Sequence, residues 1–148
     1  MPERYPPDDP REWLSTARSH LALARATQEG IYLEDLSFHA QQAGEKAVKA
    51  LLISLGVEFP YVHDMARLLT LVEEAGQEIP EPVREAESLT GFAIFARYPG
   101  LAGPVSQEEY AKAISLAEEV VRWVENRLGS QKRKGRTSSG SEGGNDIE

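Results

Sequence analysis

The chain has 148 residues, enough for one domain with a hydrophobic core and too few to expect two. It contains no cysteine, which excludes disulfides, thiolate metal sites and cysteine nucleophiles. Its formal net charge of −8 disfavours general nucleic-acid binding, because the neutralisation of phosphates supplies most of the non-specific affinity.

Residues 1–8 contain three prolines, so we expect a flexible N-terminus. This segment lacks the apolar core of a signal peptide, and no run of about 18 apolar residues occurs, so we expect a cytoplasmic protein without membrane contact. Asp9 as N-cap and Pro10 after it predict the start of a first helix that ends by Gly30. The apolar residues of this helix recur at helical spacing: Trp13, Ala17, Leu21 and Ala24.

Glu34 and Asp35 are expected in the first turn of a second helix. This is the long central helix, whose residues 38–55 run to Gly56 with an alanine-rich face and a polar stripe. The stripe consists of Gln41, Gln42, Glu45, Lys46 and Lys49, with apolar residues at both of its ends. Two interpretations remain open. Either Glu45 and Lys49 form a solvated ion pair worth a few tenths of a kcal/mol, or the stripe lines a groove or a subunit contact. The apolar ends of the stripe lead us to expect a homodimer.

Three further helices are predicted. Asp64 as N-cap and Gly76 as C-terminal stop delimit the third, and Pro80 opens the fourth, which runs to Arg97. A capping box at residues 106–109 opens the last helix, which runs to Gly129. No segment alternates with period two, so we predict an all-α, up-and-down-like bundle of about five helices at residues 9–129 without a sheet. Residues 130–148 are predicted to form a disordered tail, whose basic cluster Lys132 to Arg136 serves for solubility or for binding.

The sequence offers few groups for chemistry. His20, His39 and His63 are the only histidines and none is spaced to share a metal ion with another, so we expect no metal and no cofactor. Arg97, beside Tyr98, is either a cation at the end of its helix or an anion contact. His63, just before Asp64, is either a satisfied loop residue or part of a site.

Several segments together resemble the HEPN family, in particular the group encoded beside minimal nucleotidyltransferases. The similar segments are Trp13-Leu14 in the first helix, Gln41 to Leu52, His63 to Leu69, Ala96-Arg97-Tyr98-Pro99 and Ala117-Glu118-Glu119-Val120, and the resemblance covers residues 9–128. It implies a helical bundle that commonly forms homodimers with a cleft between the subunits.

Many HEPN proteins are metal-independent ribonucleases with an arginine, four to six residues, and then a histidine at that cleft. This chain departs from the pattern, because no arginine lies at the required distance before any histidine, and Ala102, Gly103 and Pro104 stand where a histidine would follow Arg97. The leading hypothesis is a non-catalytic or weakly catalytic, nucleotide- or partner-binding protein that pairs with a separate nucleotidyltransferase in a toxin–antitoxin-like system. The candidate cleft residues are Gln41, Glu45, Lys46, Lys49, His63, Asp64, Arg97 and Tyr98. The alternatives are an RNA-cleaving toxin that uses Arg97 and His63, and a purely structural homodimer.

Overall fold

The computed structural model describes residues 2–95 and 104–140, with side chains except at 94, 95 and 130–140, and every regular element in these ranges is helical. The elements are α1 (Pro10–Ala24), α2 (Leu33–Ser54), α3 (Met65–Glu74), α4 (Glu81–Arg84), the 3₁₀ helix η1 (Glu85–Thr90), α5 (Gly91–Phe95) and α6 (Gln107–Gly140). The predicted all-α fold is confirmed.

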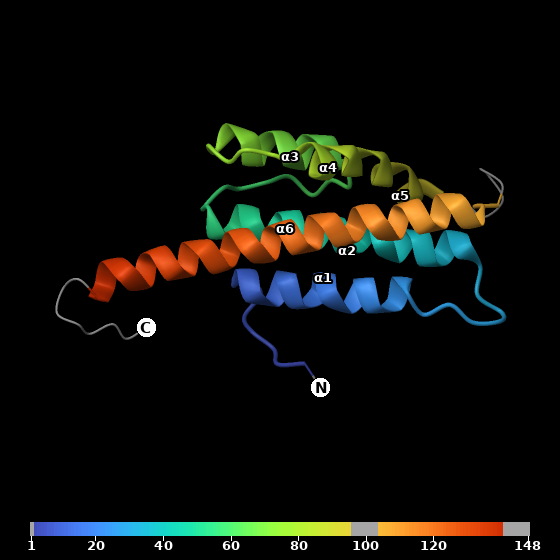
Figure 1. Cartoon of the computed structure of the whole chain (residues 1–148), viewed down its shortest axis with the longest axis horizontal. Helices are drawn as coiled ribbons and strands as arrows, with labels where there is room; N and C mark the ends of the chain where they lie inside the picture. The colour runs from blue at the N-terminus through green and yellow to red at the C-terminus, as the bar shows by residue number, and fades with distance from the viewer. Residues whose placement is uncertain (1, 96–103, 141–148) are drawn as a thin grey trace.

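Helix α2 is the centre of the bundle. It contacts α1, α3, η1, α5 and α6, and Figure 1 shows it between α1 and α3 with α6 running along it. Every residue from Ala40 to Leu52 is buried except the half-buried Lys46. Small side chains on α2 allow this close packing, as at Gly44, where an added Cβ would lie 2.8 Å from Met65 Cε and 3.3 Å from Leu89 Cδ1.

The predicted helix starts are confirmed. The Asp9 side chain accepts a hydrogen bond from Arg11 N at 2.9 Å, and Asp64 accepts from two backbone N–H groups in the first turn of α3. Ser106 and Glu109 form the reciprocal capping box before α6, with Ser106 N to Glu109 Oε1 at 2.8 Å and Glu109 N to Ser106 Oγ at 3.0 Å. These starts depend only on neighbouring residues, which is why the sequence is sufficient to predict them.

Two predicted helix ends are also confirmed, whereas the last is wrong. Gly56 and Gly76 have φ of 73° and 95°, the left-handed conformation that follows α2 and α3. Gly129 has no positive φ, and α6 continues to Gly140. Glutamine, lysine and arginine after Gly129 are good helix formers, so a glycine that keeps right-handed geometry does not end the helix. The rest of the predicted tail, residues 141–148, lies outside the described residues.

The predicted fourth helix is three consecutive pieces, α4, η1 and α5, rather than one regular α-helix. Thr90, at the end of η1, accepts a hydrogen bond at 3.0 Å from the backbone N–H of Met65 at the start of α3. This tertiary hydrogen bond lies at the junction of η1 and α5, and the hydrophobic periodicity of the sequence does not predict it. The predicted end of this helix at Arg97 lies outside the described residues.

The N-terminal segment contacts α1. Glu12 accepts hydrogen bonds from Arg4 Nε at 3.1 Å and from the backbone N–H of Tyr5 at 2.9 Å, and Trp13 Nε1 donates to the carbonyl of Pro7 at 2.7 Å. The flexibility of residues 1–8 stays a prediction. Within the described residues, no helix combines the length and the apolar character needed to span a membrane.

Candidate functional site

A polar cluster lies inside the bundle on one face of α2. Gln41, Glu45 and Lys49 follow one another at four-residue steps, and none is more than 4% exposed. Glu45 Oε1 accepts a hydrogen bond from Gln41 Nε2 at 2.8 Å, and Glu45 Oε2 accepts from Lys49 Nζ at 2.6 Å. The Glu45–Lys49 pair is therefore buried within the monomer, and the interpretation of a solvated surface pair is wrong.

His63 extends the cluster to the surface. Its Nδ1 lies 2.8 Å from Glu45 Oε1, and its side chain is 43% exposed. Because a carboxylate oxygen accepts, Nδ1 carries the proton and leaves Nε2 as the other polar atom of the ring. The neighbouring Asp64 caps α3, which fixes the backbone next to His63. We call Gln41, Glu45, Lys49 and His63 the Glu45 cluster.

The hydrogen bonds of the cluster keep Glu45 ionised. Burial by itself raises the pKa of a carboxyl group, but the donors Lys49, His63 and Gln41 outweigh it and hold the pKa of Glu45 below its ordinary value. A buried charge of this kind is tolerated only when its lone pairs are satisfied.

A second group of side chains lies beside the cluster where α1, α2 and the loop after α2 meet. Lys46 Nζ lies 5.6 Å from the centroid of the Trp13 ring, and Trp13 meets Phe59 edge to face with centroids 6.0 Å apart. Lys49 Nζ of the Glu45 cluster lies 5.5 Å from the Phe59 ring, which joins the two groups. We call Trp13, Lys46, Phe59 and the 97% exposed Tyr61 the Trp13 face.

Lys46 differs from Lys49 in its surroundings. Among the described residues it contacts the Trp13 ring but has no hydrogen bond or ion pair to a protein group. Burial lowers the pKa of Lys46, Glu45 partly offsets this effect, and the charge of Lys49 adds to it. The structure thus holds a half-buried ammonium group without a carboxylate bonded to it, a costly arrangement that an anion would relieve.

Two hollows flank Trp13. One has a volume of 220 Å³ and is lined by Pro7, Glu12, Trp13, Thr16 and Lys46. The other has a volume of 320 Å³ and is lined by Trp13, Ile53, Val57, Glu58, Phe59 and Tyr61. An aromatic ring that lines two hollows, with a cation over it, offers a surface for stacking of a planar group and a positive charge next to it.

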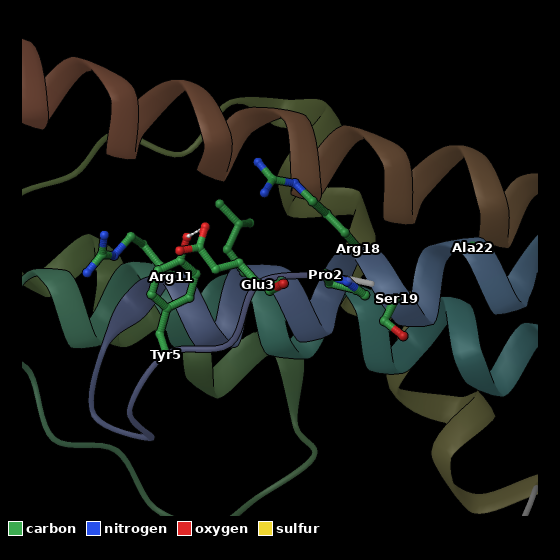
Figure 2. A pocket seen from close by; sticks show the side chains of 9 residues that line it. Pro2, Glu3, Tyr5, Arg11, Arg18, Ser19 and Ala22 are labelled. Carbon is green, nitrogen blue, oxygen red and sulfur yellow. Dashed lines mark hydrogen bonds between the residues drawn. The ribbon is translucent and has the colours of Figure 1, made fainter.

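A further hollow of 720 Å³ lies along α1 beside the N-terminal segment (Figure 2). Its charged lining groups already have partners, since Arg11 pairs with Asp9 at 2.8 Å and Arg18 with Glu125 at 2.6 Å. Tyr5 likewise donates to Glu3 at 3.1 Å. With these groups satisfied, the hollow offers less to a ligand than the Trp13 face does.

The structure brings most of the predicted site residues together. Gln41, Glu45, Lys49 and His63 form one cluster, and Asp64 serves as the cap beside it, while Lys46 turns to Trp13 instead. Arg97 and Tyr98 lie outside the described residues. The roles of Trp13 and Phe59 were missed, because at helical spacing Trp13 has the pattern of an ordinary core residue and Phe59 lies in a loop without periodicity.

Sequence reasoning also missed a contact between His20 on α1 and His39 on α2, whose Nδ1 atoms are 3.0 Å apart. The contact could have been predicted from equal residue spacings on the two antiparallel helices. His20 follows Trp13 by seven residues, and His39 precedes Lys46 by seven, so the Trp13–Lys46 contact predicts the histidine contact two turns away.

Comparison with known proteins gives a match to the family model of the HEPN domain over residues 10–127. The chain belongs to the HEPN family. Two solved structures are similar to this HEPN chain. TT1696 from Thermus thermophilus is 33% identical, with a TM-score of 0.67 over 79% of this chain and 96% of that one. ST0689, an archaeal HEPN homologue, is 27% identical, with a TM-score of 0.66 over 81% of this chain and 98% of that one.

The HEPN bundle presents two chemical capacities side by side. The Trp13 face combines an aromatic ring with a half-buried ammonium group, and the Glu45 cluster holds a partly exposed imidazole by its Nδ1 atom. No group of three or more His, Asp or Glu side chains gathers around a metal position in residues 2–95 and 104–140.

Proposed function

We propose that this HEPN chain is the nucleotide- or partner-binding component of a two-protein system, paired with a separate minimal nucleotidyltransferase in a toxin–antitoxin-like arrangement. The observation that carries the proposal is Lys46, a half-buried ammonium group over the Trp13 ring that lines one of the two hollows to which this ring contributes. Nucleotides combine a planar base with a phosphate, and these are the two features that the Trp13 face can engage.

Energetics favour a local contact of this kind. The net charge of −8 provides no general attraction for a polyanion, so affinity has to come from a few well-placed groups. Stacking of one base on an aromatic side chain contributes about 1–3 kcal/mol. A hydrogen bond from a charged donor contributes about 1.5–3 kcal/mol. Together these contributions suffice for binding of one nucleotide at a single small face.

Nucleotide binding is tested by calorimetric titration of ATP and AMP into the wild type and Lys46→Met. We expect Lys46→Met to weaken binding about 10- to 100-fold, since it removes one charge-assisted contact. Lys112→Met is the matched control and should bind like the wild type. Lys112 is exposed on α6, near Tyr110, which bonds to Ala24 at the opposite end of α1 from Trp13. Equal affinities for all three proteins would refute the role of Lys46.

Pairing is tested first by a search of the gene neighbourhood for a nucleotidyltransferase, then by co-expression of the two proteins and measurement of the mass of the purified complex. A gene neighbourhood without a nucleotidyltransferase, or two proteins that elute separately, would refute the pairing.

The proposal includes a homodimer. It rests on the family, whose members are often dimers. Light scattering should give twice the chain mass of 16.4 kDa. A mass equal to that of one chain at micromolar concentration would refute the dimer.

A second candidate function, RNA cleavage, is favoured by one observation, the contact between Glu45 and His63. A carboxylate that holds Nδ1 of an imidazole leaves Nε2 free to take the proton of a ribose 2′-hydroxyl while that oxygen attacks the adjacent phosphorus atom. The 5′-oxygen then leaves with a proton from solvent, and a 2′,3′-cyclic phosphate remains.

This candidate is tested on single-stranded RNA of mixed sequence with the wild type, His63→Ala and the control His20→Phe. A general base should account for about a hundredfold or more of the rate, so His63→Ala should lose cleavage that His20→Phe retains. Absence of cyclic-phosphate products with the wild type would exclude the candidate. If neither nucleotide nor RNA is bound, the remaining alternative is the structural homodimer.

A further inference from the structure

One of the two hollows beside Trp13 carries a single charged side chain, Glu58. This hollow has a volume of 320 Å³, within the range of about 300–1,000 Å³ that is typical of small-molecule sites. Its other lining residues are aromatic or aliphatic: Trp13, Ile53, Val57, Phe59 and Tyr61. The Glu58 carboxylate is therefore the group that can select among the ligands that enter this hollow.

The Glu58 carboxylate has no protein partner in the part of the chain that the structure describes. The side chain is exposed, and neither a hydrogen bond nor an ion pair joins it to another described residue. Glu45 and Glu12 differ in this respect, because each accepts hydrogen bonds from neighbouring groups. Two carboxylate oxygens with unused lone pairs thus lie at the wall of an aromatic hollow.

The chemistry of the nucleobases decides which of them such a carboxylate binds. A carboxylate only accepts hydrogen bonds, and its two oxygens match two parallel N–H donors. Guanine presents such a pair on its Watson–Crick edge, with N1–H next to the 2-amino group. Adenine and cytosine place a ring nitrogen that accepts next to their amino group, and uracil has a carbonyl on each side of its N3–H. With these bases, one carboxylate oxygen would face another acceptor.

We propose that the Trp13 face is specific for guanine nucleotides and that Glu58 determines this specificity. The base stacks on the aromatic rings of the hollow with its Watson–Crick edge at Glu58, and the phosphate lies towards Lys46. Lys46 and Glu58 line different hollows and Trp13 lines both, so the cation and the carboxylate engage different ends of one nucleotide. The reverse orientation would place the phosphate beside a like charge. This specificity rests on the nucleotide binding proposed for the Trp13 face.

The specificity is tested by calorimetric titration of GMP, IMP and AMP at pH 7 into the wild type, Glu58→Gln and Glu29→Gln. The base of IMP has the N1–H of guanine but lacks the 2-amino group. Glutamine keeps the length of the Glu58 side chain and replaces one acceptor with a donor. Glu29→Gln is the matched control, because Glu29 is exposed in the loop that joins α1 to α2, at the other end of α1 from Trp13.

We expect the wild type to bind GMP about tenfold more tightly than AMP, with IMP between them, since a bidentate contact discriminates between bases by at least this order. Glu58→Gln should weaken GMP binding about tenfold and leave AMP binding unchanged. Glu29→Gln should bind all three nucleotides as the wild type does. Lys46→Met should weaken all three by a similar factor, because they share the phosphate.

Equal wild-type affinities for GMP and AMP would overturn the specificity, and so would a Glu58→Gln variant that still prefers GMP. If Glu58→Gln bound all three nucleotides more tightly by the same factor, Glu58 would act only by repelling phosphate, and the specificity would again be overturned. Each of these outcomes leaves the proposed nucleotide binding in place. Absence of binding by all three nucleotides would overturn both proposals.

Discussion

Glu45 combines a full negative charge with complete burial, and this combination depends on its three donors. Each carboxylate oxygen accepts at least one hydrogen bond, from Gln41 and His63 on Oε1 and from Lys49 on Oε2. Loss of Glu45 leaves the Lys49 ammonium group buried without a counter-charge, whereas loss of one donor leaves Glu45 with the other two. The energetic consequence of a substitution here therefore depends on which partner remains.

Glu45→Gln should destabilise the fold by about 3–5 kcal/mol, because it leaves the Lys49 ammonium group buried without a counter-charge. The double variant Glu45→Gln/Lys49→Met should recover most of this loss, since methionine fills the space of the lysine stem without its charge. Urea denaturation of the single and double variants measures the coupling. If the two substitutions are each destabilising and simply additive, the buried pair does not act as a unit.

The acid stability of the protein should also depend on Glu45. Its folded-state pKa lies below the unfolded value of about 4.3, so its stabilising contribution is complete above that pH and is lost as the pH falls through the folded pKa. The stability difference between wild type and Glu45→Gln should shrink as the pH falls below about 4. Urea midpoints measured at a series of pH values test this expectation, and a difference independent of pH would contradict it.

At this scale, sequence reasoning succeeds where the chemistry is local. Asp9, Asp64 and the capping box at Ser106 act on N–H groups two or three residues away, so their roles follow from the sequence. Whether Glu45 and Lys49 face water or the interior depends on the loop that brings His63 and Phe59 over them. That loop has no periodicity, so the choice between a solvated pair and a lined groove could not be made from the sequence.

Among the elements, α2 depends on close contact with its neighbours, and Gly44 marks a point of close approach. Met65 from α3 and Leu89 from η1 occupy the space where its Cβ would lie. Glycine in a helix normally costs stability relative to alanine, so its presence here is explained by packing.

Gly44→Ala should therefore destabilise the protein by about 1–3 kcal/mol, through displacement of Met65 and Leu89. Gly129→Ala is the control, because this glycine lies in α6 without a positive φ and with nothing within 4 Å of an added Cβ. The control should be stabilising by about 0.5–1 kcal/mol, the usual helical preference for alanine. Chemical denaturation of the two variants measures whether each unfolding free energy is lower or higher than that of the wild type. If Gly44→Ala were stabilising, Met65 and Leu89 would have to move aside at little cost in free energy.

The helical pieces differ in how well periodicity predicts them. The apolar repeats of α1, α2, α3 and α6 are long and regular, and their existence and type are confirmed. The stretch of α4, η1 and α5 changes its helical type at a hydrogen bond between Met65 N and Thr90, which no local pattern contains. The His20–His39 contact became predictable only once the pairing of α1 with α2 was known.

For the whole molecule, α6 is the longest helix described, and Figure 1 shows its C-terminal end reaching past the other helices. Among the side chains described, the last buried one in α6 is Val124, and Leu128 is half-buried. The helix beyond Gly129 therefore begins where the described core ends.

Truncation after Gly129 should change the melting temperature by no more than a few degrees, because the removed residues follow the described core. Truncation after Arg122 is the comparison, since it also removes Trp123 and Val124 and should unfold the protein or lower its melting temperature sharply. Thermal denaturation of both forms checks the expectation. A large loss in the longer form would show that residues 130–148 pack against the bundle.

The pairing of α1 with α6 has a consequence for how the chain folds. Arg18 and Glu125 are 107 residues apart in sequence, and Arg25 and Glu118 are 93 apart, yet each forms an ion pair. Contact between α1 and α2 closes only the short loop that joins them. Contact between α1 and α6 closes a loop that contains most of the chain, at a larger entropic cost. During synthesis α6 emerges after the other helices of the bundle, so the faces of α1 and α2 that it covers remain in contact with water until then. The nascent protein is most exposed to aggregation in that interval.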